Sequence, residues 1–447
     1  MCHAALRSRT CRIISSWTMN YTYKNIWLIN FPVMMSILIE QLINITDAIF
    51  LGHVGEIELG ASALAGIWYL AIYMLGFGFS LGLQVVIARR NGERHYSETG
   101  KTFFQGLFFL SGLAVFLYLF SRLFSPIILS RLIASAEVYH AVIDYLDGRI
   151  WGLLFSFPFL ALRSFMVGIT YTKALNMAAL TAVLVNILSN WLLIFHWNMG
   201  IAGAAIASSF AEACSLAVLA IRVSRKMDKR LYDLSWSFDK GVLLHVCRVS
   251  VWSMFHSFIS VAPWFLFFVA IEHLGELQLA AANILRSISA LFFVIVNSFA
   301  ATTGSLVSNL IGANERGQVF PLCSRVIRLG YAIGLPLITL ALVFHQPVVS
   351  VYTDNSNIVQ TAWLPFVVML LNYVFALPGY VYMNAVTGTG ATRTAFIFQA
   401  TTIVAYLLYL WGLSYWDVPL AVYWTVEYLF VIGLGVQSVI YLKYKHY

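Results

Sequence analysis

The sequence predicts an all-α polytopic membrane protein, in which twelve transmembrane helices form two parallel six-helix repeats around a central cavity. Three observations predict this fold class: the length of the apolar runs, the placement of basic residues, and an internal duplication. Of the 447 residues, 60% are hydrophobic and only 10% are charged. A water-soluble chain cannot bury that much apolar surface, so this chain is expected to cross a lipid bilayer many times.

Apolar runs of spanning length provide the helices, since a span needs about 20 predominantly apolar residues. The predicted spans are 26–51, 61–88, 103–123, 140–168, 175–196, 200–221, 243–270, 280–311, 324–350, 357–386, 396–413 and 416–442. An even number of spans places both ends of the chain on the same side of the membrane.

Basic residues show which side that is. Most of the 27 Lys and Arg residues lie in the two tails, the loops after even-numbered spans, and the stretch at 222–242. Because basic loops stay cytoplasmic, we expect both termini in the cytoplasm. We also expect this multi-pass protein in the plasma (inner) membrane. The net charge of +8 is spread over these loops rather than gathered on one face, so nucleic acid is not an expected partner.

The stretch at 222–242 also divides the chain. We expect a cytoplasmic tail at 1–25, an N-lobe of helices 1–6 at 26–221, a cytoplasmic linker at 222–242, a C-lobe of helices 7–12 at 243–442, and a tail at 443–447. The first 18 residues are basic and have no apolar run typical of a signal peptide. They are either a cytoplasmic tail or the product of an upstream start codon, with translation beginning at Met19.

The two halves repeat each other. A shift of 220 residues (273 minus 53) aligns HVGEIELG at 53–60 with HLGELQLA at 273–280. The same shift pairs Gly92 with Gly312, Pro158 with Pro378, Gly168 with Gly388, Thr172–Lys173 with Thr392–Arg393, and Trp191 with Trp411. So many matches in one register indicate a duplication. Each half has an even number of spans, so the repeats are parallel and related by an axis along the membrane normal.

The first span carries a polar stripe. Glu40, Asn44 and Asp47 are spaced i, i+4, i+7 and therefore share one helix face. A charged side chain at the bilayer centre costs about 2.5–3.5 kcal/mol on insertion scales, so the stripe must face a partner or a watery cavity. It is either a polar patch that holds helices together or a proton or cation site in a transporter.

The repeat favours the second interpretation, because Asp47 aligns with Phe267 and the stripe has no counterpart in the second half. Three other polar residues are expected at the depth of Asp47: Asn186 and Asn190 on the fifth span, and Ser208 on the sixth. We predict that these four residues form a coupling site for H⁺ or Na⁺, although ordinary interhelical hydrogen bonding remains an alternative for Asn190 and Ser208.

Glu40 and Glu212 are candidate secondary acidic sites. Glu212 lies one turn beyond Ser208 and is a second proton carrier, a counter-charge for substrate, or the partner of an internal arginine. Arg163 and Arg286 are the internal arginines we considered, and both are equally compatible with a structural role. Glu427 in the last span has a weaker claim.

Several classes of site are not expected. The sequence has no P-loop, HExxH, GxSxG or paired CxxC motif, and its five cysteines are scattered. We therefore expect no enzyme activity, no cofactor, and no metal other than Na⁺ at the coupling site.

Several short segments together resemble the multidrug and toxic compound extrusion (MATE) transporters, over about residues 20–442. They are DAIFLGHVG from Asp47, RSFMVG from Arg163, the Thr172–Lys173 turn, GIAGAAIA from Gly200, and the second-half segments HLG from His273, LIGAN from Leu310 and GTGATR from Gly388. The resemblance is closer to the branch with its acidic site in the N-lobe.

The resemblance implies a secondary active antiporter that exports cationic, lipophilic compounds in exchange for protons or Na⁺ by alternating access. It matches Asp47, Asn186 and Ser208 to the family's cation site, whereas Asn190 stands where the family often has Asp. It also associates Pro32 with bending of the first helix. We expect a monomer whose partners are the bilayer and small organic cations. The alternatives are a lipid-linked oligosaccharide or lipid flippase of the same superfamily and an integral membrane enzyme.

Overall fold

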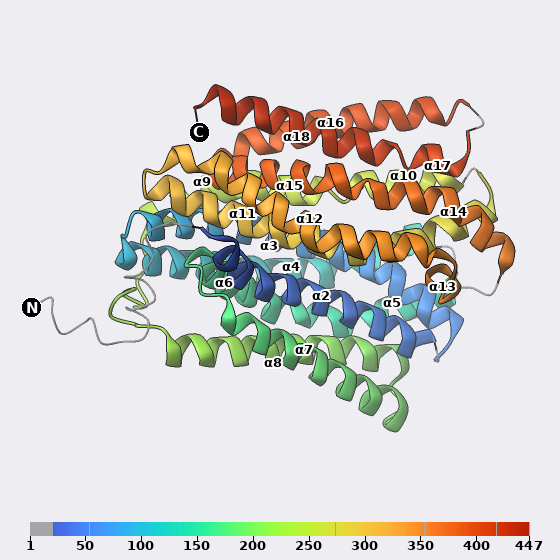
Figure 1. The fold of residues 1–447 in the computed structure, drawn as a ribbon. Coiled ribbons are helices and arrows are strands. Elements are labelled where there is room, and N and C mark those ends of the chain that lie inside the picture. The colour runs from blue at the N-terminus through green and yellow to red at the C-terminus, as the bar shows by residue number, and fades with distance from the viewer. Residues whose placement is uncertain are drawn as a thin grey trace, which may run out of the picture.

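The structure is a computed structural model that describes residues 21–446, apart from 53, 134, 273, 353–354 and 417. Every regular element in these residues is a helix (Figure 1). The elements are α2 (Tyr23–Gly52), α3 (Glu56–Gly92), α4 (Tyr96–Leu132), α5 (Ala136–Arg149), η2 (Ile150–Gly152), α6 (Leu153–Gly168), α7 (Lys173–Asn190), η3 (Trp191–His196), α8 (Gly200–Lys226), α9 (Lys240–Ile259), α10 (Ala262–Glu272), α11 (Glu276–Gly312), η4 (Arg316–Gln318), α12 (Val319–Val343), α13 (His345–Ser350), α14 (Ser356–Leu371), α15 (Tyr373–Gly388), α16 (Thr392–Leu413), α17 (Leu420–Tyr423) and α18 (Val426–Tyr444). The helices lie side by side in a bundle, with α7 and α8 along one edge and α16 and α18 along the opposite edge.

Twelve stretches within the described residues are long and apolar enough to cross a membrane, which confirms the predicted number of spans. Several of them contain a break that hydropathy does not reveal. The fourth span is α5, η2 and α6 in succession, and the tenth is α14 and α15 joined at Asn372. The seventh is divided between α9 and α10, where Pro263 lies in the first turn of α10. Proline cannot donate its backbone nitrogen, so it is tolerated at a helix start but not in the interior hydrogen bonds.

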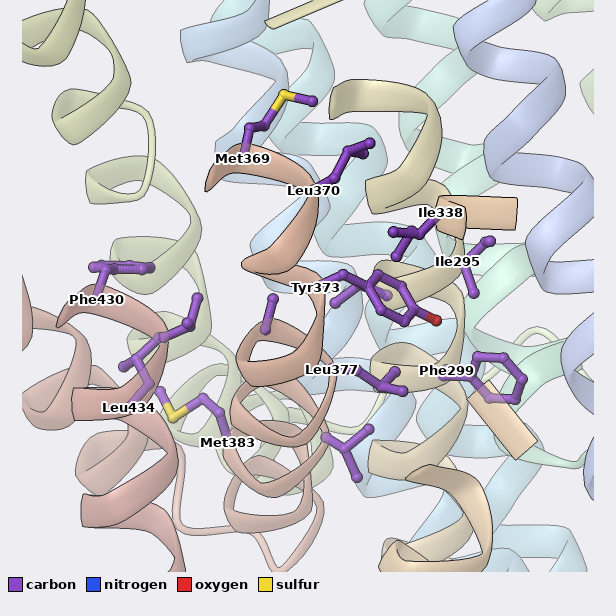
Figure 2. Close-up of a cluster of buried hydrophobic side chains, with 14 of the residues drawn as sticks. Ile295, Phe299, Ile338, Met369, Leu370, Tyr373, Leu377, Met383, Phe430 and Leu434 are labelled. Atoms are coloured by element: carbon purple, nitrogen blue, oxygen red, sulfur yellow. The ribbon is translucent and has the colours of Figure 1, made fainter. Parts of the chain in front are cut away.

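The buried apolar side chains form two separate cores. One is built from residues between Val33 and Val246, and the other mainly from residues between Phe267 and Leu442. Figure 2 shows part of the second core, where side chains of α11, α14, α15 and α18 meet. Helix α2 belongs to both cores, because Ile26 and Ile29 pack in the second one and Val33 and Leu51 in the first.

The predicted linker at 222–242 contains only a short non-helical segment, because α8 continues to Lys226 and α9 begins at Lys240. This segment is anchored to the first half of the chain. Tyr232 is buried and packs edge-on against Tyr96 and Phe165. The side-chain amide of Gln105 donates to the carbonyl of Ser237 at 2.6 Å.

Helices α3 and α11, which are related by the duplication, meet closely near their C-terminal ends. Asn91 donates to Asn309 across the contact at 2.7 Å. A Cβ at Gly92 would overlap the backbone of Asn309, and a Cβ at Gly312 would overlap the backbone of Arg89. The two glycines occupy equivalent places in the repeat (312 minus 92 is again 220). Small residues permit such backbone contacts between membrane helices, so this pair brings the two halves together at one end of the bundle.

Gly312→Val should separate the halves at this contact. We expect the substitution to destabilise the protein by about 1–3 kcal/mol, because the added side chain overlaps backbone atoms that cannot move independently. The measurement is the melting temperature of the purified protein in detergent. Gly112→Val on α4 is the matched control, since nothing lies within 4 Å of a Cβ at Gly112. Equal melting temperatures for the two variants would contradict the prediction.

Candidate functional site

Asp47 on α2 is held by three side chains. Asn186 donates to its Oδ1 at 3.0 Å, Asn190 donates to the same oxygen at 2.6 Å, and Ser208 donates to its Oδ2 at 2.6 Å. Only 9% of Asp47 is exposed. The structure thus brings together all four residues that were predicted as the coupling site.

Helix α7 contributes both amides. Asn186 and Asn190 are one turn apart on the same face, and neither has any exposed surface. Asn190 also donates to Asn186 Oδ1 at 3.2 Å, which fixes the two amides relative to each other. Directly after Asn190 the chain continues as the π-helical segment η3, a widened turn of a kind that often occurs at functional sites.

Helix α8 contributes the hydroxyl. Ser208 is 3% exposed, and it accepts a hydrogen bond from Asn186 at 3.1 Å while it donates to Asp47. The preceding turns of α8 carry Gly203, Ala204 and Ala207, all of them buried. These small residues allow α8 to pack closely against α7, and this brings Ser208 within reach of both the amide and the carboxylate.

The site can exist with Asp47 charged or protonated. Burial disfavours the charged carboxylate, whereas three donors aimed at its two oxygens favour it. Asp47 forms no salt bridge within the described part of the chain. Asn190 Oδ1 is buried without a hydrogen-bond partner among these residues. A proton on Asp47 would remove the buried charge, and a cation would need oxygen ligands, which the amides offer only after rotating about their terminal bonds.

The other predicted residues lie elsewhere. Pro32 is buried inside α2, which runs through it as a single helix. Glu40 belongs to the same helix, and the structure describes its backbone but not its side chain. Glu212 on α8 forms a salt bridge with Arg149, the last residue of α5, and Glu212 Oε1 lies 2.7 Å from Arg149 Nη2. Of the three roles considered for Glu212, the structure shows the pairing with an internal arginine.

The partner is not one of the two arginines considered from the sequence. Arg163 lies over the ring of Phe77 at 5.7 Å and Arg286 over that of Phe268 at 5.3 Å. Arg149 was overlooked, although an ionisable residue inside a predicted span is itself a signal. Tyr145, one turn before Arg149, was also missed. It is buried in the first core, 7% exposed, at the same end of α5 as Arg149.

Known proteins share both the sequence pattern and the fold. The probable multidrug resistance protein NorM of Shewanella oneidensis is 22% identical over 89% of this chain and 85% of its own length. The multidrug resistance protein MdtK of Cronobacter sakazakii is 23% identical over 93% of each chain. The solved outward-facing conformation of a multidrug resistance MATE family transporter of the MOP superfamily superposes with a TM-score of 0.84 at 20% identity, over 95% of each chain.

The MatE family itself matches residues 32–192 and 253–411, one segment in each half of the duplication. These two segments cover well over half of the chain. Together with the twelve apolar stretches, they identify a multi-pass membrane protein. The chain belongs to the MatE family of membrane transporters.

Proposed function

We propose that this protein is a secondary active antiporter that exports cationic, lipophilic compounds in exchange for protons by alternating access. The relatives named as multidrug resistance proteins support the class of cargo. The observation that carries the proposal is the buried Asp47, held by three donors that come from two other helices. We further propose the plasma (inner) membrane as the location, because the relatives are bacterial multidrug resistance proteins. The distribution of basic residues supports cytoplasmic termini.

Asp47 is proposed as the residue whose charge changes during transport. Protonation removes a buried negative charge and weakens the need for three donors, so the two protonation states favour different arrangements of α2, α7 and α8. A difference in free energy between two arrangements is what couples ion binding to the movement of cargo.

The proton is proposed as the coupling ion for two reasons. First, the site contains a single carboxylate. Second, both asparagines turn their N–H groups toward it rather than their oxygens. Both features oppose the binding of Na⁺, which needs several oxygen ligands.

The two inner arginines of the first half, Arg149 and Arg163, do not support the flippase alternative. A carrier of pyrophosphate-linked lipids would need cationic side chains free to meet the phosphates. Arg149 is paired with Glu212, and Arg163 is 8% exposed and lies over Phe77.

Asp47→Asn tests the proposed site. We expect the variant to reach the membrane at the normal level and to lose at least about tenfold in ethidium transport, because the group that changes charge is gone. Transport is measured in proteoliposomes under an imposed pH gradient. Asp144→Asn is the control, since Asp144 is an exposed carboxylate on α5. Full transport by the Asp47 variant would refute the assignment.

Asn190→Asp tests the coupling ion. Asn190 donates to Asp47 at 2.6 Å, so a carboxylate in its place would put two negative charges side by side. Such a pair requires a shared proton or a bound cation. We expect an imposed Na⁺ gradient to drive ethidium transport in this variant but not in the unmodified protein. If the unmodified protein responds to Na⁺ and not to pH, the proposal of proton coupling is wrong.

A further inference from the structure

A second charged cluster lies in the first half of the chain, on α3, α5 and α8. The guanidinium of Arg149 lies over the ring of Tyr69, 3.9 Å from its centroid, and is paired with Glu212. The hydroxyl of Tyr69 donates to the carboxylate of Glu212 at 3.4 Å. The cation is thus held between an aromatic face and a carboxylate.

This arrangement is typical of sites that bind organic cations. An aromatic face attracts a cation through its quadrupole, and the attraction is strongest where water is excluded. Tyr69 is 8% exposed, so its ring is largely shielded from solvent. Gly152 lies beside the pair, and a Cβ there would overlap both Glu212 and Arg149.

The hydrogen-bonding capacity of Arg149 is not fully used in this site. Its Nη1 is buried and has no hydrogen-bond partner within the described part of the chain. A buried donor without a partner is less stable than the same donor in water. An organic cation that needs fewer hydrogen bonds can therefore compete with the guanidinium.

The second half of the chain lacks this chemistry. The shift of 220 residues takes Tyr69 to Ser289, Arg149 to Met369, and Glu212 to Ile432. Ser289 and Met369 line a small apolar pocket, together with Phe292, Phe293, Val296, Leu370 and Tyr373. Figure 2 shows Met369 and Tyr373 of this pocket. The aromatic face, the carboxylate and the arginine are thus a feature of the first half alone.

We propose that Tyr69 and Glu212 form the binding site for the positively charged group of the exported compound, and that Arg149 occupies this site as a tethered competitor when no compound is bound. The cargo class, an amphiphilic organic cation, rests on the proposed function. The paired state keeps the site neutral while it is empty. Binding of an organic cation replaces the guanidinium on the same carboxylate and ring.

A purely structural ion pair would behave differently. If Arg149 only joined α5 to α8, its removal would leave cation binding unchanged or weaken it. A competitor, in contrast, lowers the apparent affinity for the cation, because the cation can bind only during the fraction of time that the site is free. Removal of a competitor therefore strengthens binding, and the sign of the change separates the two roles.

The test is the binding of tetraphenylphosphonium to the purified full-length protein, measured by titration calorimetry. We expect Arg149→Gln to bind about tenfold more tightly, because the competing charge is gone. Glu212→Gln should bind at least about tenfold more weakly, since the counter-charge is lost. Glu427→Gln is the matched control. Glu427 is also buried and accepts a hydrogen bond from a tyrosine, Tyr406, but it pairs with no arginine among the described residues.

A second pair of variants keeps the test decisive if Arg149→Gln does not fold. Tyr69→Phe retains the ring and should bind within about threefold of the unmodified protein, whereas Tyr69→Leu loses the ring and should bind about tenfold more weakly. Melting temperatures of all variants identify those that fold.

The outcomes separate this inference from the proposed function. If the unmodified protein transports ethidium but its folded Arg149 variant binds tetraphenylphosphonium no more tightly, the tethered competitor is refuted and the antiporter stands. If Glu212→Gln binds as well as Glu427→Gln, or Tyr69→Leu as well as Tyr69→Phe, the site is refuted. If the unmodified protein neither binds nor transports organic cations, the proposed function itself fails.

Discussion

The burial of one carboxylate constrains the first half of this molecule. Asp47 can remain inside an apolar bundle only if its charge is met by donors or removed by a proton. Three donors on two other helices meet it here, so α2, α7 and α8 must converge at one depth. The small residues of α8 and the one-turn spacing of the two asparagines on α7 both serve this convergence. A change in the charge of Asp47 changes the strength of the hydrogen bonds that hold α7 and α8 to α2.

A change in the charge of Asp47 can affect the second half of the molecule through helix α2. Its outer part holds Asp47 against α7 and α8, whereas near its start Asn30 bonds to α11, donating to Ser298 at 3.4 Å and accepting from Thr302 at 2.9 Å. Pro32 lies between these two attachments and cannot donate the helical hydrogen bond of its own turn. The helix is therefore fixed at both ends and weakened between them. We propose that a local change of charge at Asp47 bends α2 near Pro32.

Much of this could be predicted from the sequence, for physical reasons. Membrane spans are long apolar runs, and their alternating direction fixes the depth of each polar residue, so Asp47, Asn186, Asn190 and Ser208 could be placed together. The rotation of a helix about its own axis is harder to predict from sequence, because a membrane span is apolar on most sides. Depth alone therefore did not show that Arg149 meets Glu212 and Tyr69. The break at Asn372 was also hidden, since hydropathy measures composition and not backbone continuity.

The second half also has a buried acid, but it lies on a helix that is not equivalent to α2. Asn186 aligns with Tyr406, and the hydroxyl of Tyr406 donates to Glu427 at 3.1 Å. Glu427 lies at the start of α18, which packs mainly against α15 and α16 of its own half. Asp47 lies on α2, which packs against α7 and α8 and also against α11 and α12. A change of charge at Glu427 acts on neighbours within one half, whereas a change at Asp47 acts on the helix shared by both. We therefore expect the acid on α2, rather than Glu427, to couple an ion to the movement of the two halves.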